Sequence, residues 1–175
     1  DIRRRAKIVV AYGACAATGG INALKNHMDD YHEAVYGEHA RDPHLQSGPA
    51  LPVSAVIKVD YEAKGCPMSK YELLDIISNL LHGCEPQIPT YPVCVECKRN
   101  ETVCRFDEGD HCMGMVARAG CGAPCPADGI PCEACRGFVD EPNLRTLEKV
   151  LMERAGFSQK RAIGKARMFT ANLRG

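Results

Sequence analysis

The sequence lacks several features that mark whole classes of protein. It contains no tryptophan, and aromatic residues make up only 6% of its 175 residues. No charge of one sign prevails, because 22 Lys and Arg balance 22 Asp and Glu. Such a surface does not attract nucleic acid or an anionic membrane as a whole, and no apolar run approaches the ~18 residues that span a bilayer. The sequence therefore favours a globular protein with no membrane span and no nucleic-acid partner.

A secretory signal is also missing. The apolar run at residues 8–11 is too short for the ~7–15 residues of a signal-peptide core, and no cleavage site follows it. Disulfides are disfavoured in reducing compartments, and eleven cysteines would leave one unpaired. We therefore interpret the cysteines as metal or cluster ligands in preference to a disulfide framework.

The first 83 residues have the pattern of an α/β fold. The β-branched run at residues 6–12 predicts a buried strand that ends at Gly13, and residues 53–59 (VSAVIKV) predict a second one. Apolar residues at helical spacing from Ile21 to Tyr31 predict a helix, with Thr18 as its cap. Residues 37–52 are rich in Gly, Pro and polar side chains and predict a long loop.

A second helix is predicted from Ser69 to about His82. Ser69 and Glu72 have the spacing of a capping box, and Gly83 is a typical stop. The leucines and isoleucines between them predict broad burial of this helix.

Residues 84–142 differ in composition from the rest of the chain, since they hold nine of the eleven cysteines and have almost no apolar periodicity. We expect this segment to bury too little apolar surface to offset its chain entropy, so that something else must organise it. Residues 143–175 then predict two helices, capped by Asn143 and Ser158, whose apolar faces extend to Phe169 and Leu173.

Eight cysteines within residues 94–135 form two sets of four. The first quartet is Cys94, Cys97, Cys104 and Cys112, and the second quartet is Cys121, Cys125, Cys132 and Cys135. Each contains one Cys-x-x-Cys pair, which places two thiolates on one turn facing a common centre. The pattern predicts two tetrathiolate sites.

Spacing favours iron–sulfur clusters over zinc at both sites. Structural zinc is usually held by two Cys-x2-Cys pairs separated by a longer spacer, whereas each quartet has only one such pair. Cys125 is followed by proline, as in cluster motifs of the ferredoxin type. The spacing does not name the metal, and a ligand could be shared between the quartets as in bacterial ferredoxins.

Two further cysteines follow the predicted strands. Cys15 lies among glycines just after the first strand and Cys66 lies a few residues after the second, at the carboxyl ends where α/β folds place their sites. Cys84 is interpreted as an ordinary packing thiol and His111 as a loop histidine near a cluster sulfur. The arginines of the cysteine-rich segment either stabilise anionic clusters or face solvent.

Four stretches resemble the small, electron-transfer subunit of nickel–iron hydrogenases, of the cytoplasmic type found in sulfhydrogenases and in NAD(P)- or deazaflavin-linked enzymes. They are GACAATGGINALKN (13–26), KGCPMSKYELLDII (64–77), PVCVECKRNETVC (92–104), and HCMGMVARAGCGAPCP with CEACRG (111–137). The resemblance implies a flavodoxin-like parallel-sheet domain, a cysteine-rich segment with two 4Fe–4S clusters, and two C-terminal helices. It also implies cytoplasmic localisation.

The same resemblance implies roles for the cysteines. Cys15 and Cys66 match two ligands of a proximal 4Fe–4S cluster, the first quartet matches the distal cluster, and the second quartet matches the medial one. The two other proximal ligands lie in a Cys-x-x-Cys loop that this chain lacks, so we expect an upstream strand, loop and helix. The nickel–iron centre belongs to the large subunit, which we expect to meet the strand ends at Cys15 and Cys66, with residues 37–52 as a contact arm. Flavin or iron–sulfur diaphorase or reductase subunits are the other expected partners.

Two other functions fit parts of the sequence. The related subunit of complex I-like enzymes shares the fold and the proximal site but normally carries one cluster, which the two quartets argue against. A zinc-stabilised binding module would explain the quartets without a redox role. The basic C-terminus gives little support to nucleic-acid binding, since no exposed aromatics are interleaved with it.

Overall fold

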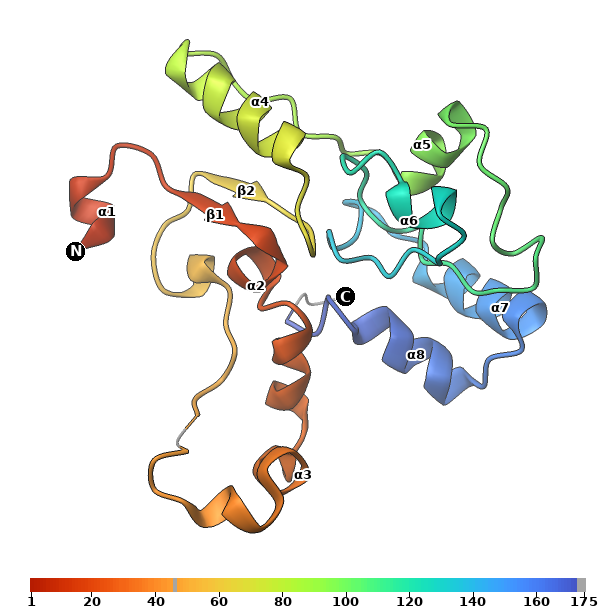
Figure 1. Ribbon diagram of the computed structural model, residues 1–175, viewed down its shortest axis with the longest axis horizontal. Coiled ribbons are helices and arrows are strands. Elements are labelled where there is room, and N and C mark those ends of the chain that lie inside the picture. The colour runs from red at the N-terminus through yellow and green to blue at the C-terminus, as the bar shows by residue number, and fades with distance from the viewer. Residues whose placement is uncertain (46, 173–175) are drawn as a thin grey trace.

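The computed structural model describes residues 1–45 and 47–172 (Figure 1). Its strands are β1 (Val10–Tyr12) and β2 (Tyr61–Ala63). Its α-helices are α1 (Ile2–Arg5), α2 (Gly13–Thr18), α3 (Tyr31–Tyr36), α4 (Lys70–Leu81), α5 (Val93–Arg99), α6 (Pro124–Ala127), α7 (Leu144–Ala155) and α8 (Gln159–Arg167). Short 3-10 helices cover Ile21–His27, Gly37–Arg41 and Val53–Ala55. In Figure 1 the sheet and α4 lie on one side of the molecule, and α5 to α8 lie on the other.

The two strands pair in parallel, as the sequence predicted. Val10 lies opposite Tyr61 and Tyr12 lies opposite Ala63. Asp60 fixes this register from just outside the sheet, because its carboxylate accepts the Val9 N–H at 2.8 Å and pairs with Arg3. Among the described residues the sheet has these two strands, so the α/β class is confirmed in the form of a small parallel sheet followed by a cysteine-rich remainder.

The predicted strand at residues 53–59 is wrong. Val53–Ala55 forms a 3-10 turn, and the strand starts only after Asp60. The apolar run is not buried, since Val56 is 76% exposed. The pairing partner of β1 is therefore selected by the polar anchor at Asp60 and not by the most apolar stretch.

The helix predicted from Ile21 to Tyr31 is also corrected. Thr18 is the last residue of α2, where its hydroxyl donates to Ala14 O at 3.0 Å and lies 3.1 Å from Phe169 O. Its short side chain is thus used inside the fold and does not cap a following helix. A 3-10 helix and then α3 replace the expected continuous helix. The Gly37–Arg41 turn occupies the start of the predicted loop.

Helix α4 begins and ends where the sequence predicted. Ser69 accepts the Glu72 N–H at 3.4 Å, and the helix ends at Leu81, just before Gly83 in a left-handed conformation. The predicted broad burial is wrong, since Ile76 is its buried residue and Leu81 is 80% exposed. The Glu72 carboxylate binds Arg136 in place of the Ser69 N–H that a capping box would give it.

The main apolar core lies in the part of the chain that was expected to lack one. Val93, Met113 and Val116 of the cysteine-rich segment pack with Leu147 and Leu151 of α7. Alanines at irregular positions fill the remaining space. For this reason the apolar periodicity of the sequence did not predict this core. Residues 84–142 and the C-terminal helices therefore share one core.

Both C-terminal helices are confirmed with their caps. Asn143 accepts the Thr146 N–H at 2.9 Å, and Ser158 accepts the Arg161 N–H at 3.3 Å. Phe169 is buried as predicted, while Leu173 lies outside the described residues. Within the described ranges no helix combines the length and apolarity that crossing a membrane requires.

Candidate metal centres

The first quartet gathers around the N-terminal end of α5. Cys94 and Cys97 lie on this helix, and Cys104 and Cys112 approach from the loops that follow. Burial raises the pKa of Cys94 to about 11, and the neighbouring thiolates of Cys112, Cys97 and Cys104 contribute to this rise. The four thiols are thus close enough to repel one another when they ionise.

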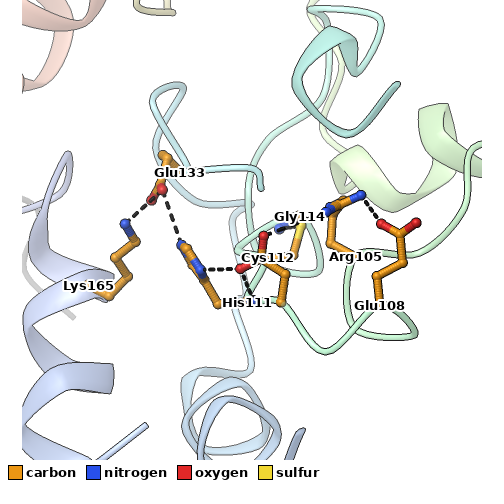
Figure 2. A network of polar contacts seen from close by, with 8 residues as sticks. Arg105, Glu108, His111, Cys112, Gly114, Glu133 and Lys165 are labelled. Carbon is orange, nitrogen blue, oxygen red and sulfur yellow. Dashed lines mark hydrogen bonds and ion pairs between the residues drawn. The ribbon is translucent and has the colours of Figure 1, made fainter. Parts of the chain in front are cut away.

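Gly114 lies between two of these thiols. Its N–H donates to Cys112 Sγ at 3.4 Å (Figure 2). A Cβ at this position would lie 3.3 Å from Cys112 Sγ and 3.6 Å from Cys94 Sγ. Any larger residue would crowd the sulfurs, which explains the glycine beside this quartet.

The second quartet surrounds a cavity. All four of its cysteines line one cavity of about 190 Å³, together with Cys66. Burial raises the pKa of Cys121 to about 11, and burial also raises the pKa of Cys132 strongly. Both residues are partly buried, and a cation inside the cavity would favour the ionised form of their thiols.

A cavity lined by four thiols fits a centre larger than one ion. In the described part of the chain, no three His, Cys, Asp or Glu side chains meet closely enough to hold a single metal ion. Four sulfurs on one zinc ion each lie about 2.3 Å from it, whereas the ligands of a 4Fe–4S cluster bind different irons. The donors around both quartets are the thiolates that such clusters require.

The turns that carry Cys15 and Cys66 lie side by side. The Ala14 N–H donates to Gly65 O at 2.8 Å, which joins the start of α2 to the loop after β2. The Cys15 thiol is exposed and lies near Gly20, where a Cβ would come within 3.0 Å of it. Cys66 is exposed as well and lies at the cavity of the second quartet. A shared cluster for these two cysteines remains a prediction.

Polar residues beside the quartets were missed or misread from the sequence. His111 Nε2 lies 3.1 Å from Glu133 Oε1, which also accepts from Lys165 Nζ of α8 at 2.7 Å (Figure 2). His111 Nδ1 lies 2.9 Å from Asp110 Oδ1, so its hydrogen-bond partners are carboxylates and not a sulfur. Cys84 is exposed, so its interpretation as a packing thiol is wrong.

The arginines of the cysteine-rich segment differ in their surroundings. Arg118 and Arg105 pair with nearby acids at its edge, and Arg99 lies over the Tyr91 ring. Arg136 is buried against Glu72. The position of Arg136 directly after a quartet cysteine was the only sequence signal for this pair.

The structure thus defines a mixed α/β protein with a small parallel sheet and a cysteine-rich remainder. The sequence profile of the family described as NADH ubiquinone oxidoreductase, 20 Kd subunit, matches residues 1–80. A subunit of the F420-non-reducing hydrogenase vhu of Methanocaldococcus jannaschii is 38% identical, over 81% of this chain and 59% of its own length. The delta subunit of sulfhydrogenase 2 of Pyrococcus furiosus is 34% identical, over 87% of this chain and 64% of its own.

A more distant relative is the iron-sulfur subunit of the F420-non-reducing hydrogenase of Archaeoglobus profundus. It is 25% identical, over 78% of this chain and 58% of its own length. The chain is thus similar, over most of its length, to the small subunits of nickel–iron hydrogenases. It spans about three fifths of the length of the curated relatives that it matches.

Proposed function

We propose that this chain is an electron-transfer subunit of a nickel–iron hydrogenase and that its two quartets hold 4Fe–4S clusters. The observation that carries the proposal is the cavity lined by all four cysteines of the second quartet, in a chain similar to hydrogenase small subunits. Relatives carry the names hydrogenase and iron-sulfur subunit, which agree with such a role. The first quartet would hold a distal cluster and the second a medial one.

A bound 4Fe–4S cluster supplies a centre that gains and loses one electron. The chain's own residues hold it and set its surroundings. Burial of Cys94, Cys121 and Cys132 excludes water from the sulfurs. Backbone N–H groups of Gly114 and Ala123 lie at the sulfurs of Cys112 and Cys121, where they stabilise negative charge.

The partners follow from the same proposal. Cys15 and Cys66 would supply two ligands of a proximal cluster next to the large, nickel–iron subunit. Electrons would then pass through the quartets to a flavin or iron–sulfur diaphorase or reductase subunit. The large subunit would perform the chemistry, and this chain would relay electrons.

A second candidate rests on the match of residues 1–80 to the 20 Kd subunit of NADH ubiquinone oxidoreductase. That match ends before the first quartet, and both quartets lie outside it. The hydrogenase relatives extend across most of the chain, including this segment. We therefore favour the hydrogenase role for the whole chain.

Metal and acid-labile sulfide analysis of the anaerobically purified chain tests the proposal. We expect iron and labile sulfide in equal amounts and no stoichiometric zinc. Stoichiometric zinc without sulfide would instead establish the zinc-stabilised module. Co-purification with a hydrogenase large subunit then separates the hydrogenase role from the complex I-like one.

A further inference from the structure

A buried ion pair joins the α/β part of the chain to the second quartet. Arg136 directly follows Cys135, and Glu72 lies in the first turn of α4. Their side chains are 2% and 8% exposed. Both terminal nitrogens of the guanidinium donate to the carboxylate, with Nη1 2.6 Å from Oε2. A two-pronged contact of this kind fixes orientation as well as distance.

The remaining donors of Arg136 reach two other cysteine-bearing stretches. Nη1 also donates to Lys64 O at 2.5 Å, two residues before Cys66. Nε donates to Ala119 O at 2.8 Å, two residues before Cys121. One guanidinium therefore ties together the backbone near Cys66 and Cys121 and its own neighbour Cys135.

Gly120 provides the space for this arrangement. Its φ is +115°, and a Cβ there would overlap the Arg136 guanidinium. The Gly120 N–H donates to Glu96 Oε1 at 2.8 Å, and Glu96 lies between the two α5 cysteines. Hydrogen bonds at the neighbouring residues Ala119 and Gly120 thus link Arg136 to Glu96, beside the first quartet.

We propose that Arg136 and Glu72 form a positioning pair that holds Cys135 and Cys66 in fixed relation at the cavity of the second quartet. Cys66 and Cys135 both line this cavity. The positioning is a property of the chain itself, whereas its effect on a cluster potential rests on the proposed function. Arg136 acts through Cys135 and touches no reacting atom.

The pair also balances charge beside the second quartet. If Glu72 is neutralised, the guanidinium remains buried without its partner, a state that is unfavourable in a low-dielectric interior. The junction then loosens locally. The unpaired positive charge also stabilises the more negative, reduced form of a neighbouring cluster, so the midpoint potential of that cluster rises.

Peptide-resolved alkylation tests the positioning in Glu72→Gln, which keeps the shape of the side chain. A second variant, Arg136→Lys, keeps the positive charge but loses the two-pronged contact. Glu153→Gln is the matched control, because it removes the same charge from the exposed pair between Lys149 and Glu153. The full chain is alkylated as purified and again after metal removal, so the readout does not depend on which metal is bound.

Because Cys66 is already exposed, Cys135 carries the readout. We expect alkylation of Cys135 to become several-fold faster in both test variants, with Cys94 and Cys97 unchanged and the control equal to wild type. An unchanged rate at Cys135, or an equal rise at Cys94, Cys97 and Cys135, would overturn the positioning role. The second outcome would mean that the pair only supports global folding.

Potentiometric EPR titration of the same variants adds the electronic readout. We expect Glu72→Gln to raise the midpoint potential of one cluster and to leave the other unchanged. A shift in both or in neither would contradict the placement of the pair beside the second quartet. A wild-type chain without iron would overturn the proposed function, while the alkylation result would still decide the positioning pair.

Discussion

The two halves of this molecule are stabilised in different ways. In the first 83 residues the buried apolar side chains are mostly alanines, and large ones such as Tyr12, Leu74 and Leu81 are exposed. After Val93, larger side chains including Met113 and Leu151 are fully buried. The first 83 residues, for which the sequence predicted more regular secondary structure, thus have the smaller apolar core. Apolar periodicity alone does not locate stability, because small residues in irregular loops can pack as closely as helices do.

Polar contacts connect the halves. Thr18 reaches Phe169 O, Asn172 donates to Ala50 O, and Arg136 donates to Lys64 O. The α/β half is therefore held partly by hydrogen bonds to the other half. Changes in the second half should propagate to the first more than the reverse.

The largest expected effect comes from removing a quartet thiol. Cys132→Ala should lose the cluster of the second quartet, and iron should fall by about four atoms per chain. Cys84→Ala is the matched control, since Cys84 is exposed and outside both quartets. Iron analysis reads the result, and unchanged iron in Cys132→Ala would show that the quartet is assigned wrongly.

Protease resistance of Cys132→Ala tests whether the clusters or the apolar core hold the second half of the chain together. Because the second half has an apolar core of its own, loss of one cluster should loosen residues 94–135 without unfolding α7. Complete digestion of α7 in Cys132→Ala would mean that clusters, and not the core, hold this half together.

Truncating one large apolar side chain in each half should lower the free energy of unfolding by different amounts. Leu151→Ala should lower the free energy of unfolding by about 2–5 kcal/mol, because Leu151 is fully buried in the shared core. Leu81→Ala, on the exposed end of α4, should change it by less than about 0.5 kcal/mol. Urea unfolding of both variants measures the difference, and equal losses would contradict the placement of the core.

Metal removal should expose the difference between buried and exposed thiols. With a pKa of about 11, the thiols of Cys94 and Cys121 are protonated at pH 8. Their thiolate fraction should be roughly a hundredfold below that of an ordinary thiol and should rise tenfold per pH unit. Alkylation of the metal-free chain between pH 8 and pH 10 measures this, with the exposed Cys84 as reference. Equal rates at all three positions would show that these sites open when the metal leaves.

The smallest effects come from matched helix caps in the two halves. Asn143→Ala should lower the global free energy of unfolding by about 1 kcal/mol, because α7 contributes to the shared core. Ser69→Ala removes a similar cap from the exposed helix α4 and should mainly speed hydrogen exchange within α4. A larger global loss from Ser69→Ala than from Asn143→Ala would reverse the comparison.

Local signals were predictable from the sequence. The caps at Ser69, Asn143 and Ser158 depend on side chains that bond to a backbone N–H three residues on, so sequence spacing was sufficient. The parallel pairing was also predicted, but its second strand was misplaced because Asp60 sets the register through contacts with Val9 and Arg3 that lie far away in sequence.

The candidate site shows the same division. Cysteine spacing predicts two groups of four thiols, and the four cysteines of the second group line one cavity, while their role as cluster ligands stays a prediction. It did not reveal that Cys66 borders the cavity of the second quartet, nor that Glu72 binds Arg136. Both depend on long-range packing between the halves, which no periodicity encodes.

Counting iron in the anaerobically purified chain tests the central claim most directly. Two complete quartets predict about eight iron atoms per chain, with matching labile sulfide. About twelve would mean that Cys15 and Cys66 find further ligands in this chain and complete a third cluster. No iron, or about four atoms, would contradict the claim that both quartets hold 4Fe–4S clusters.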